Sequence, residues 1–138
     1  MNTLQAPAQQ HAVLELRTLI LSECEALIER GYRVRPTSSA PETFTDLKAA
    51  VQDNIIPVAN YGCDTSIYGK YTNILFRFWH DVLHLEHDLD FSTTGEQAVA
   101  DLHAEAAKQY GVSELALDIL RADTTGQVQY YAEHRAFV

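Results

Sequence analysis

Apolar residues recur along most of the chain at the three- and four-residue spacing of a helix face. The first such run covers residues 8–30 and ends before Gly31, a residue type that favours the end of a helix. Its apolar face consists of Val13, Leu16, Ile20, Leu27 and Ile28. This pattern predicts a long amphipathic helix at the start of the chain.

The same spacing predicts most of the remaining elements. Further helices are expected over residues 43–54, 71–89, 94–110 and 113–121, and 127–137 is a candidate sixth. Thr43 and Ser113 are suited to cap the helices that follow them, and Gly111 is suited to end another. Residues 33–43, with two prolines, are interpreted as a connector, and residues 55–70 as a structured loop with one short extended piece. We therefore predict an all-α fold, a single domain of five or six helices over residues 1–138.

Composition narrows the classes of partner. The formal charge is −9, from 10 basic and 19 acidic residues, which argues against binding to nucleic acid or to an anionic membrane surface. The chain has no apolar run of about 18 residues, and its start lacks the features of a signal peptide. A cytoplasmic protein is expected. Cys24 and Cys63 form no metal-binding pattern and are expected to be free thiols.

Histidines gather in the predicted helix 71–89. His80 and His84, four residues apart, project from one side of a helix about one turn from each other, and His87 returns to the same stripe. Two imidazoles at this spacing can bind one metal ion, as in the HExxH zinc motif. The alternative is that these are ordinary surface histidines, or core histidines satisfied by one hydrogen bond.

Acidic residues strengthen the metal interpretation. Between Arg77 and Lys108 there is no lysine or arginine, while seven acids lie in that interval. They are Asp81, Glu86, Asp88, Asp90, Glu96, Asp101 and Glu105. Like charges at this density repel one another unless cations relieve them, and a bound divalent ion would do so.

Glu96 is the decisive residue of this set. If the helices 71–89 and 94–110 form an antiparallel pair with a short loop, Glu96 lies near the histidine stripe. His80, His84 and Glu96 would then be the metal ligands of a His2Glu site between two consecutive helices, an open arrangement known for zinc. Alternatively, Glu96 closes a capping box that begins at Thr93.

Three neighbours are candidates for supporting roles. Asp81 and His87 are expected to take part in proton transfer or to orient the ligands. His103, seven residues after Glu96, lies on the same side of its predicted helix and is a candidate for the pocket or for contact with a ligand, or else a surface histidine. The predicted chemistry is activation of water or of a substrate oxygen by the metal, on an unknown small substrate.

The segment from His80 to Glu96 reads HDxxH, eleven residues, and then Glu, with Gly95 before the glutamate. It resembles the metal-binding motif of the Coq4 family of ubiquinone-biosynthesis proteins. The resemblance implies a mostly helical fold, a divalent ion that is usually zinc, and His80, Asp81, His84 and Glu96 as ligands or their supports. Members of that family act on a polyprenylated quinone-ring precursor and associate with membranes and lipids. The stretch FRFWHDVLH is also similar to small bacterial and phage proteins without a known reaction.

Two other functions compete. An HD-type phosphohydrolase would use the His80-Asp81 pair with an upstream histidine, for which only His11 is available, and a downstream Asp118 or Asp123. A non-catalytic acidic binding or inhibitor protein would spread its acids over an exposed face for a basic partner. Metal content separates a His2Glu site from the non-catalytic binding protein.

Overall fold

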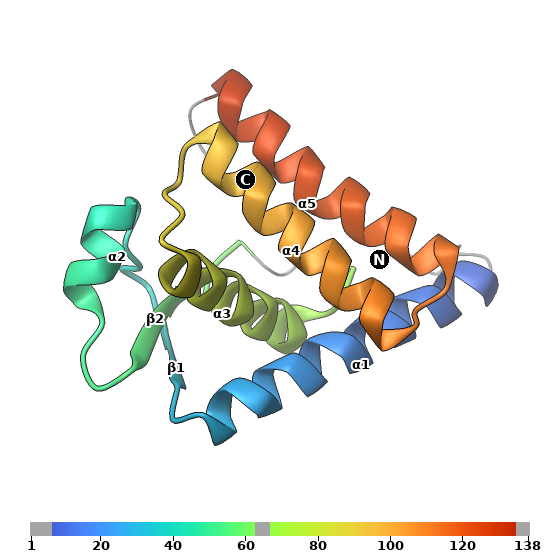
Figure 1. The fold of residues 1–138 in the computed structure, drawn as a ribbon, viewed down its shortest axis with the longest axis horizontal. Helices are drawn as coiled ribbons and strands as arrows, with labels where there is room; N and C mark the ends of the chain where they lie inside the picture. The colour runs from blue at the N-terminus through green and yellow to red at the C-terminus, as the bar shows by residue number, and fades with distance from the viewer. Residues whose placement is uncertain (1–6, 63–66, 135–138) are drawn as a thin grey trace.

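The computed structural model describes residues 7–62 and 67–134, with side chains described as far as residue 124. In this part of the chain, five helices alternate at first with two short strands (Figure 1). The elements are α1 (Pro7–Glu29), β1 (Arg33–Thr37), α2 (Phe44–Ala50), β2 (Ile55–Ala59), α3 (Lys70–His87), α4 (Thr93–Tyr110) and α5 (Glu114–His134).

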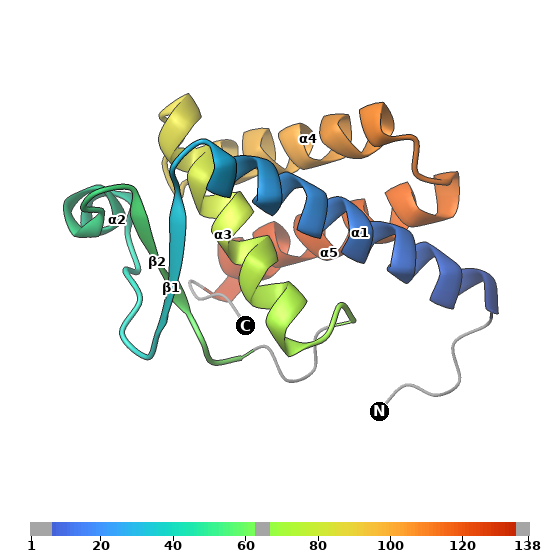
Figure 2. The same ribbon diagram turned by 90° about the horizontal axis from the view of Figure 1, so that it is seen from below.

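The helix α3 is the central element of the fold. It packs against α1, α4 and β2, and Figures 1 and 2 show it in the middle of the molecule. It buries side chains in nearly every turn, and these are Thr72, Ile74, Phe76, Phe78, Trp79, Val82 and His84. Because most of its surface is covered by protein, polar groups on α3 are held in fixed surroundings.

The limits of the first helix are within one residue of those predicted, and Gly31 lies after its end in a left-handed conformation with φ +102°. Its buried face includes the predicted Val13, Leu16, Ile20 and Leu27. Ile28 is the exception, because 40% of its surface is exposed. The apolar spacing identified the face but extended it one residue too far.

The prediction of a purely all-α fold is wrong, since β1 and β2 form a small parallel sheet. Arg33 pairs with Ile55 and Thr37 with Ala59, and α2 makes the crossover between the strands. The expected extended piece within residues 55–70 is β2, whereas the connector predicted over residues 33–43 contains β1. β1 contains Pro36 and two arginines, which an edge strand tolerates but which do not form the apolar pattern expected of a strand. No sign of β1 is therefore present in the sequence.

The two predicted C-terminal helices are one continuous helix, α5. Ser113 caps it as expected, with its hydroxyl accepting a hydrogen bond from the amide of Ala116. The hydroxyl of Thr124 donates to the carbonyl of Leu120, so this threonine bonds within the helix instead of ending it. The last residues of the predicted sixth helix, 135–137, lie outside the described residues.

Two further expectations concern the environment of the chain. Among the described residues, no helix is both long and apolar enough to cross a membrane. Cys24 is a free, buried thiol that donates a hydrogen bond to the carbonyl of Leu75, and burial raises its pKa to about 12. Such a thiol is chemically inert at neutral pH. Cys63 lies outside the described residues.

Candidate metal centre

The candidate site lies where α3 ends and α4 begins. Thr43 caps α2 as predicted, and α2 brings Phe44 to this junction, where its ring centroid lies 6.2 Å from that of His84. Figure 2 shows α4 running at a large angle to α3, so the two helices do not run alongside each other as the expected antiparallel pair would. The site therefore depends on the five residues that connect the helices, 88–92.

The turn after α3 fixes His84. Asp88 adopts a left-handed conformation, with φ 52°, and the amides of Asp88 and Leu89 both donate to the carbonyl of His84. This reversal brings the carbonyl oxygen of Leu89 to 2.6 Å from Nδ1 of His84. A carbonyl oxygen only accepts hydrogen bonds, so Nδ1 of His84 carries a proton.

The start of α4 fixes Glu96. Ser92 caps the helix by accepting a hydrogen bond from the amide of Gly95, and it donates to the carboxylate of Asp90. A side chain on Gly95 would not fit, because its Cβ would lie 2.1 Å from the carbonyl oxygen of Asp90. The backbone at Asp90 therefore lies too close to position 95 for any residue but glycine. The side chain of the next residue, Glu96, points into the junction between α3 and α4.

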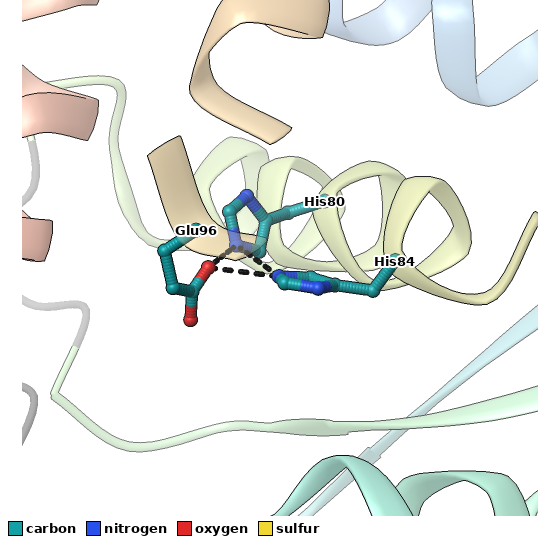
Figure 3. A group of neighbouring side chains, drawn as sticks. All are labelled: His80, His84 and Glu96. Carbon is teal, nitrogen blue, oxygen red and sulfur yellow. Dashed lines mark hydrogen bonds and ion pairs between the residues drawn. The ribbon is translucent and has the colours of Figure 1, made fainter. Parts of the chain in front are cut away.

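The capping-box interpretation of Glu96 is wrong. The cap residue is Ser92, not Thr93, which makes Gly95 the third helical residue and Glu96 the fourth. The carboxylate of Glu96 instead meets the two imidazoles of α3, as Figure 3 shows. Glu96 is 3% exposed, so this carboxylate is paired with histidines inside the protein.

Three atoms form a small triangle in the site. Oε1 of Glu96 lies 2.8 Å from Nε2 of His84 and 3.0 Å from Nε2 of His80, and the two Nε2 atoms are 3.2 Å apart. These residues form a group whose ligand atoms are close enough to hold one metal ion. Tetrahedral zinc with bonds of about 2.0–2.1 Å would separate its ligand atoms by about 3.3 Å, slightly more than these distances.

The triangle requires a positive charge. With its proton on Nδ1, a neutral His84 presents a bare nitrogen lone pair to the carboxylate of Glu96, and two lone pairs at this distance repel. A proton or a metal ion between the atoms removes the repulsion. The chemistry of these three donors therefore fits a cation, and a divalent metal ion would meet all three at once.

The pKa values of the pair agree with this reasoning. Burial alone would raise the pKa of Glu96, but hydrogen bonds and charge from His80 and His84 lower it to about 2. Burial alone would lower the pKa of His84, yet the hydrogen bond and charge of Glu96 raise it above its usual value. Without metal, the site thus holds an ionised carboxylate and a proton on His84, and a metal ion would take the place of that proton.

Asp81 and His87, the two residues predicted to support the metal ligands, lie in different surroundings. Asp81 is half-buried beside the group, and burial raises its pKa to about 6 against the lowering effect of the nearby His80 and His84. Its carboxylate is not among the three clustered donors. His87 is exposed at the last position of α3, and among the described residues none forms a hydrogen bond or ring contact with it.

His103 and two phenylalanines complete the surroundings. His103 is fully buried, so its alternative as a surface histidine is wrong. The ring of Phe91 meets the ring of His84 edge-on, with centroids 4.7 Å apart, and Phe44 packs against both rings. Sequence reasoning missed both phenylalanines. The apolar position of Phe91 in the loop was the one local sign, whereas Phe44 comes from a distant helix.

The seven acids do not crowd the site as the sequence suggested. Only Glu96 and Asp81 lie at the histidines, whereas Asp88, Asp90, Asp101 and Glu105 are exposed. Glu86 pairs with Arg30 of α1 and accepts a hydrogen bond from Tyr32. Counting only the residues between Arg77 and Lys108 therefore overestimated the unpaired negative charge, because Glu86 pairs with an arginine from another part of the chain.

The constellation of an HD-type phosphohydrolase is not assembled in the described part of the chain. The clustered donors all come from α3 and α4. His11 and Asp118 are exposed on α1 and α5, and Asp123 is half-buried on α5. None of these three joins the group within the described residues.

Comparisons with known proteins found no relative of this chain. No protein-family model, no curated protein and no solved structure matches this chain. The proposed function therefore rests on the geometry and chemistry of the site itself.

Proposed function

We propose that this protein binds one divalent metal ion, zinc by preference, through Nε2 of His80, Nε2 of His84 and Oε1 of Glu96. The observation that carries the proposal is the triangle of 2.8, 3.0 and 3.2 Å between these atoms, which needs a cation for its stability. Two imidazoles and one carboxylate suit zinc, whereas magnesium and calcium prefer ligands that are all oxygens.

The number of protein donors supports a catalytic centre over a purely structural one. Structural zinc sites use four protein ligands, whereas catalytic sites use three and leave a position for water or substrate. When bound, the ion would polarise a substrate oxygen or activate water, as in metal-dependent hydrolases and lyases. The side chain of His80 is 20% exposed while that of His84 is fully covered, so we expect a small substrate to enter on the His80 side.

Protein groups next to the donors have proposed roles as well. Asp81, half-buried beside His80, is proposed to exchange protons with a substrate or to orient the donors. A proton-transfer role for His87 stays a prediction from the sequence. The motif resemblance to the Coq4 family supports the same metal donors, and the proposal leaves the substrate open.

Metal content tests the proposal directly. Purified wild type, loaded with zinc and desalted, should retain about one equivalent by elemental analysis and native mass spectrometry. His84→Ala and Glu96→Gln should each weaken zinc binding roughly 10²–10³-fold, since about 10–16 kcal/mol of zinc binding divides over four coordination positions. These variants should lose the ion on desalting.

Two exposed residues provide matched controls on the same helices. His87→Ala removes an imidazole from α3, and Glu105→Gln neutralises a carboxylate on α4. Both should retain the zinc of the wild type. A wild type that retains no zinc, or controls that lose as much as the site variants, would refute the metal centre and favour an acidic binding protein.

A further inference from the structure

His103 is a buried polar residue that the three-donor site does not use. It lies on α4 seven residues after Glu96 and is fully inaccessible to solvent. Its ring packs between Phe76 and Trp79, with centroid distances of 4.8 and 4.2 Å. An apolar side chain would suit these surroundings better, because burying an imidazole among aromatic rings costs free energy.

The imidazole of His103 makes one polar contact among the described residues. Its Nε2 lies 2.9 Å from Nδ1 of His80, and the planes of the two rings differ by only 13°. Its other nitrogen, Nδ1, is buried and has no hydrogen-bond partner in the described part of the chain. The contact with His80 is therefore what the buried imidazole provides.

The Nδ1 atoms of His80 and His84 have different hydrogen-bond partners. Nδ1 of His84 donates to the carbonyl of Leu89, which fixes the proton on Nδ1 and leaves Nε2 bare. His80 lies in the middle of α3, where the turn after the helix cannot reach it, and the group behind its Nδ1 is His103. His103 is fully buried against two aromatic rings of α3, surroundings that disfavour a charged imidazolium, so a neutral His103 can accept a hydrogen bond at Nε2.

We propose that His103 is a positioning residue of the metal centre, accepting a hydrogen bond at Nε2 from Nδ1–H of His80. This holds His80 in the tautomer whose bare Nε2 faces Glu96 and His84. In this arrangement, the proton of His103 is on its own Nδ1. The inference rests on the proposed metal site and adds that α4 supplies both a donor, Glu96, and the group that orients a donor of α3.

Two substitutions of His103 separate hydrogen bonding from packing. His103→Gln keeps a side-chain oxygen that can accept from His80, whereas His103→Leu keeps comparable bulk and has no acceptor. Zinc affinity would be measured by competition with a chromophoric chelator. His103→Leu should bind zinc about 10–100-fold more weakly than wild type, the usual effect of losing such a partner, and His103→Gln should stay within about threefold. His11 is exposed on α1 and is not among the clustered donors, so His11→Leu and His11→Gln are the matched controls and should both equal wild type.

The position of the proton on His103 gives a second readout that packing alone would not change. In zinc-loaded wild type, nitrogen-15 NMR of the histidine rings should show His80 and His103 protonated on Nδ1, with Nε2 of His80 bound to metal. This measurement decides the matter even if His103→Leu does not fold. A proton on Nε2 of His103, or wild-type zinc affinity in folded His103→Leu, would overturn the role of His103 alone. A wild type that binds no zinc would overturn the metal site and this role together.

Discussion

The core beside α1 and the junction between α3 and α4 are equally buried but chemically opposite. On α1, Leu16 and Leu19 are fully inaccessible apolar side chains, each of which stabilises the fold by about 1.5–3 kcal/mol. At the junction, three polar side chains are only 0–3% exposed, and these are His84, Glu96 and His103. Buried polar groups stabilise a fold only weakly even when they are hydrogen-bonded. This difference is what the proposed metal site would require, with polar donors at the junction and apolar packing beside α1.

The largest expected contrast between the two regions concerns stabilisation by zinc. Leu16→Ala should lower the free energy of unfolding by about 2–5 kcal/mol, equally with zinc and with chelator, because it removes apolar packing on α1, which supplies none of the donors. In both wild type and Leu16→Ala, zinc at 100 times its Kd should add about 2.7 kcal/mol. In His84→Ala at the same zinc concentration, that increment should vanish. Urea denaturation with and without zinc measures all three, and an undiminished increment in His84→Ala would remove the distinction between the regions.

A smaller effect is expected at the glycine that sets the junction. In Gly95→Ala, the new Cβ meets the carbonyl oxygen of Asp90, so the turn must move, at a cost of about 1–3 kcal/mol in stability. Glu96 moves with it, so zinc affinity should fall as well. Gly111→Ala is the control, since its φ of +86° makes alanine strained there, but the residue is distant in sequence from the donors. It should lower stability and leave zinc affinity unchanged; equal zinc affinities in the two variants would contradict the role of Gly95.

The smallest effect is a pH dependence of about one proton. Zinc needs the bare Nε2 of His84, whose pKa Glu96 raises above the usual value despite burial. Zinc affinity should therefore rise about tenfold per pH unit up to that raised pKa and then show no further gain from His84. In Glu96→Gln, this rise should end at a lower pH, which chelator competition across pH would detect. An unchanged profile in Glu96→Gln would show that the carboxylate does not hold the proton.

In the metal-free protein, the ion pair of Glu96 and His84 should make the stability of the fold depend on pH. Relative to Glu96→Gln, the ion pair should stabilise wild type above about pH 4.5, and this advantage should be lost as the pH falls towards 2, where Glu96 takes up a proton. The contribution of His84 is fully present below pH 6.5 and should be lost as the pH rises through its raised pKa. Thermal unfolding in chelator at several pH values measures both limits.

How far the sequence predicted this molecule depends on how local each feature is. The limits of α1 and α4 followed from periodicity and the glycines after them, Gly31 and Gly111, because these signals lie within a few residues. The helix predicted over residues 43–54 was too long, since α2 ends at Ala50. The strand β1 was missed because its pairing with β2 is set across 22 residues of chain, from Arg33 to Ile55. No local pattern carries that pairing.

The candidate site shows the same limit. The spacing of His80 and His84 on one helix and the turn before Glu96 were enough to predict that these side chains meet, and they do. Two details of that prediction were wrong, since the cap is Ser92 and α4 runs at a large angle to α3 (Figure 2). The depth of burial of His103 depends on the packing of α4 against α3, and periodicity in one helix cannot supply it.

The central claim is that His80, His84 and Glu96 bind a single ion. Anomalous diffraction from a crystal of the zinc-loaded protein, measured on both sides of the zinc absorption edge, tests it most directly. The account predicts one zinc peak, about 2.0–2.2 Å from Nε2 of both histidines and from Oε1 of Glu96. The absence of a zinc peak among these three atoms, with the protein saturated in zinc, would contradict it.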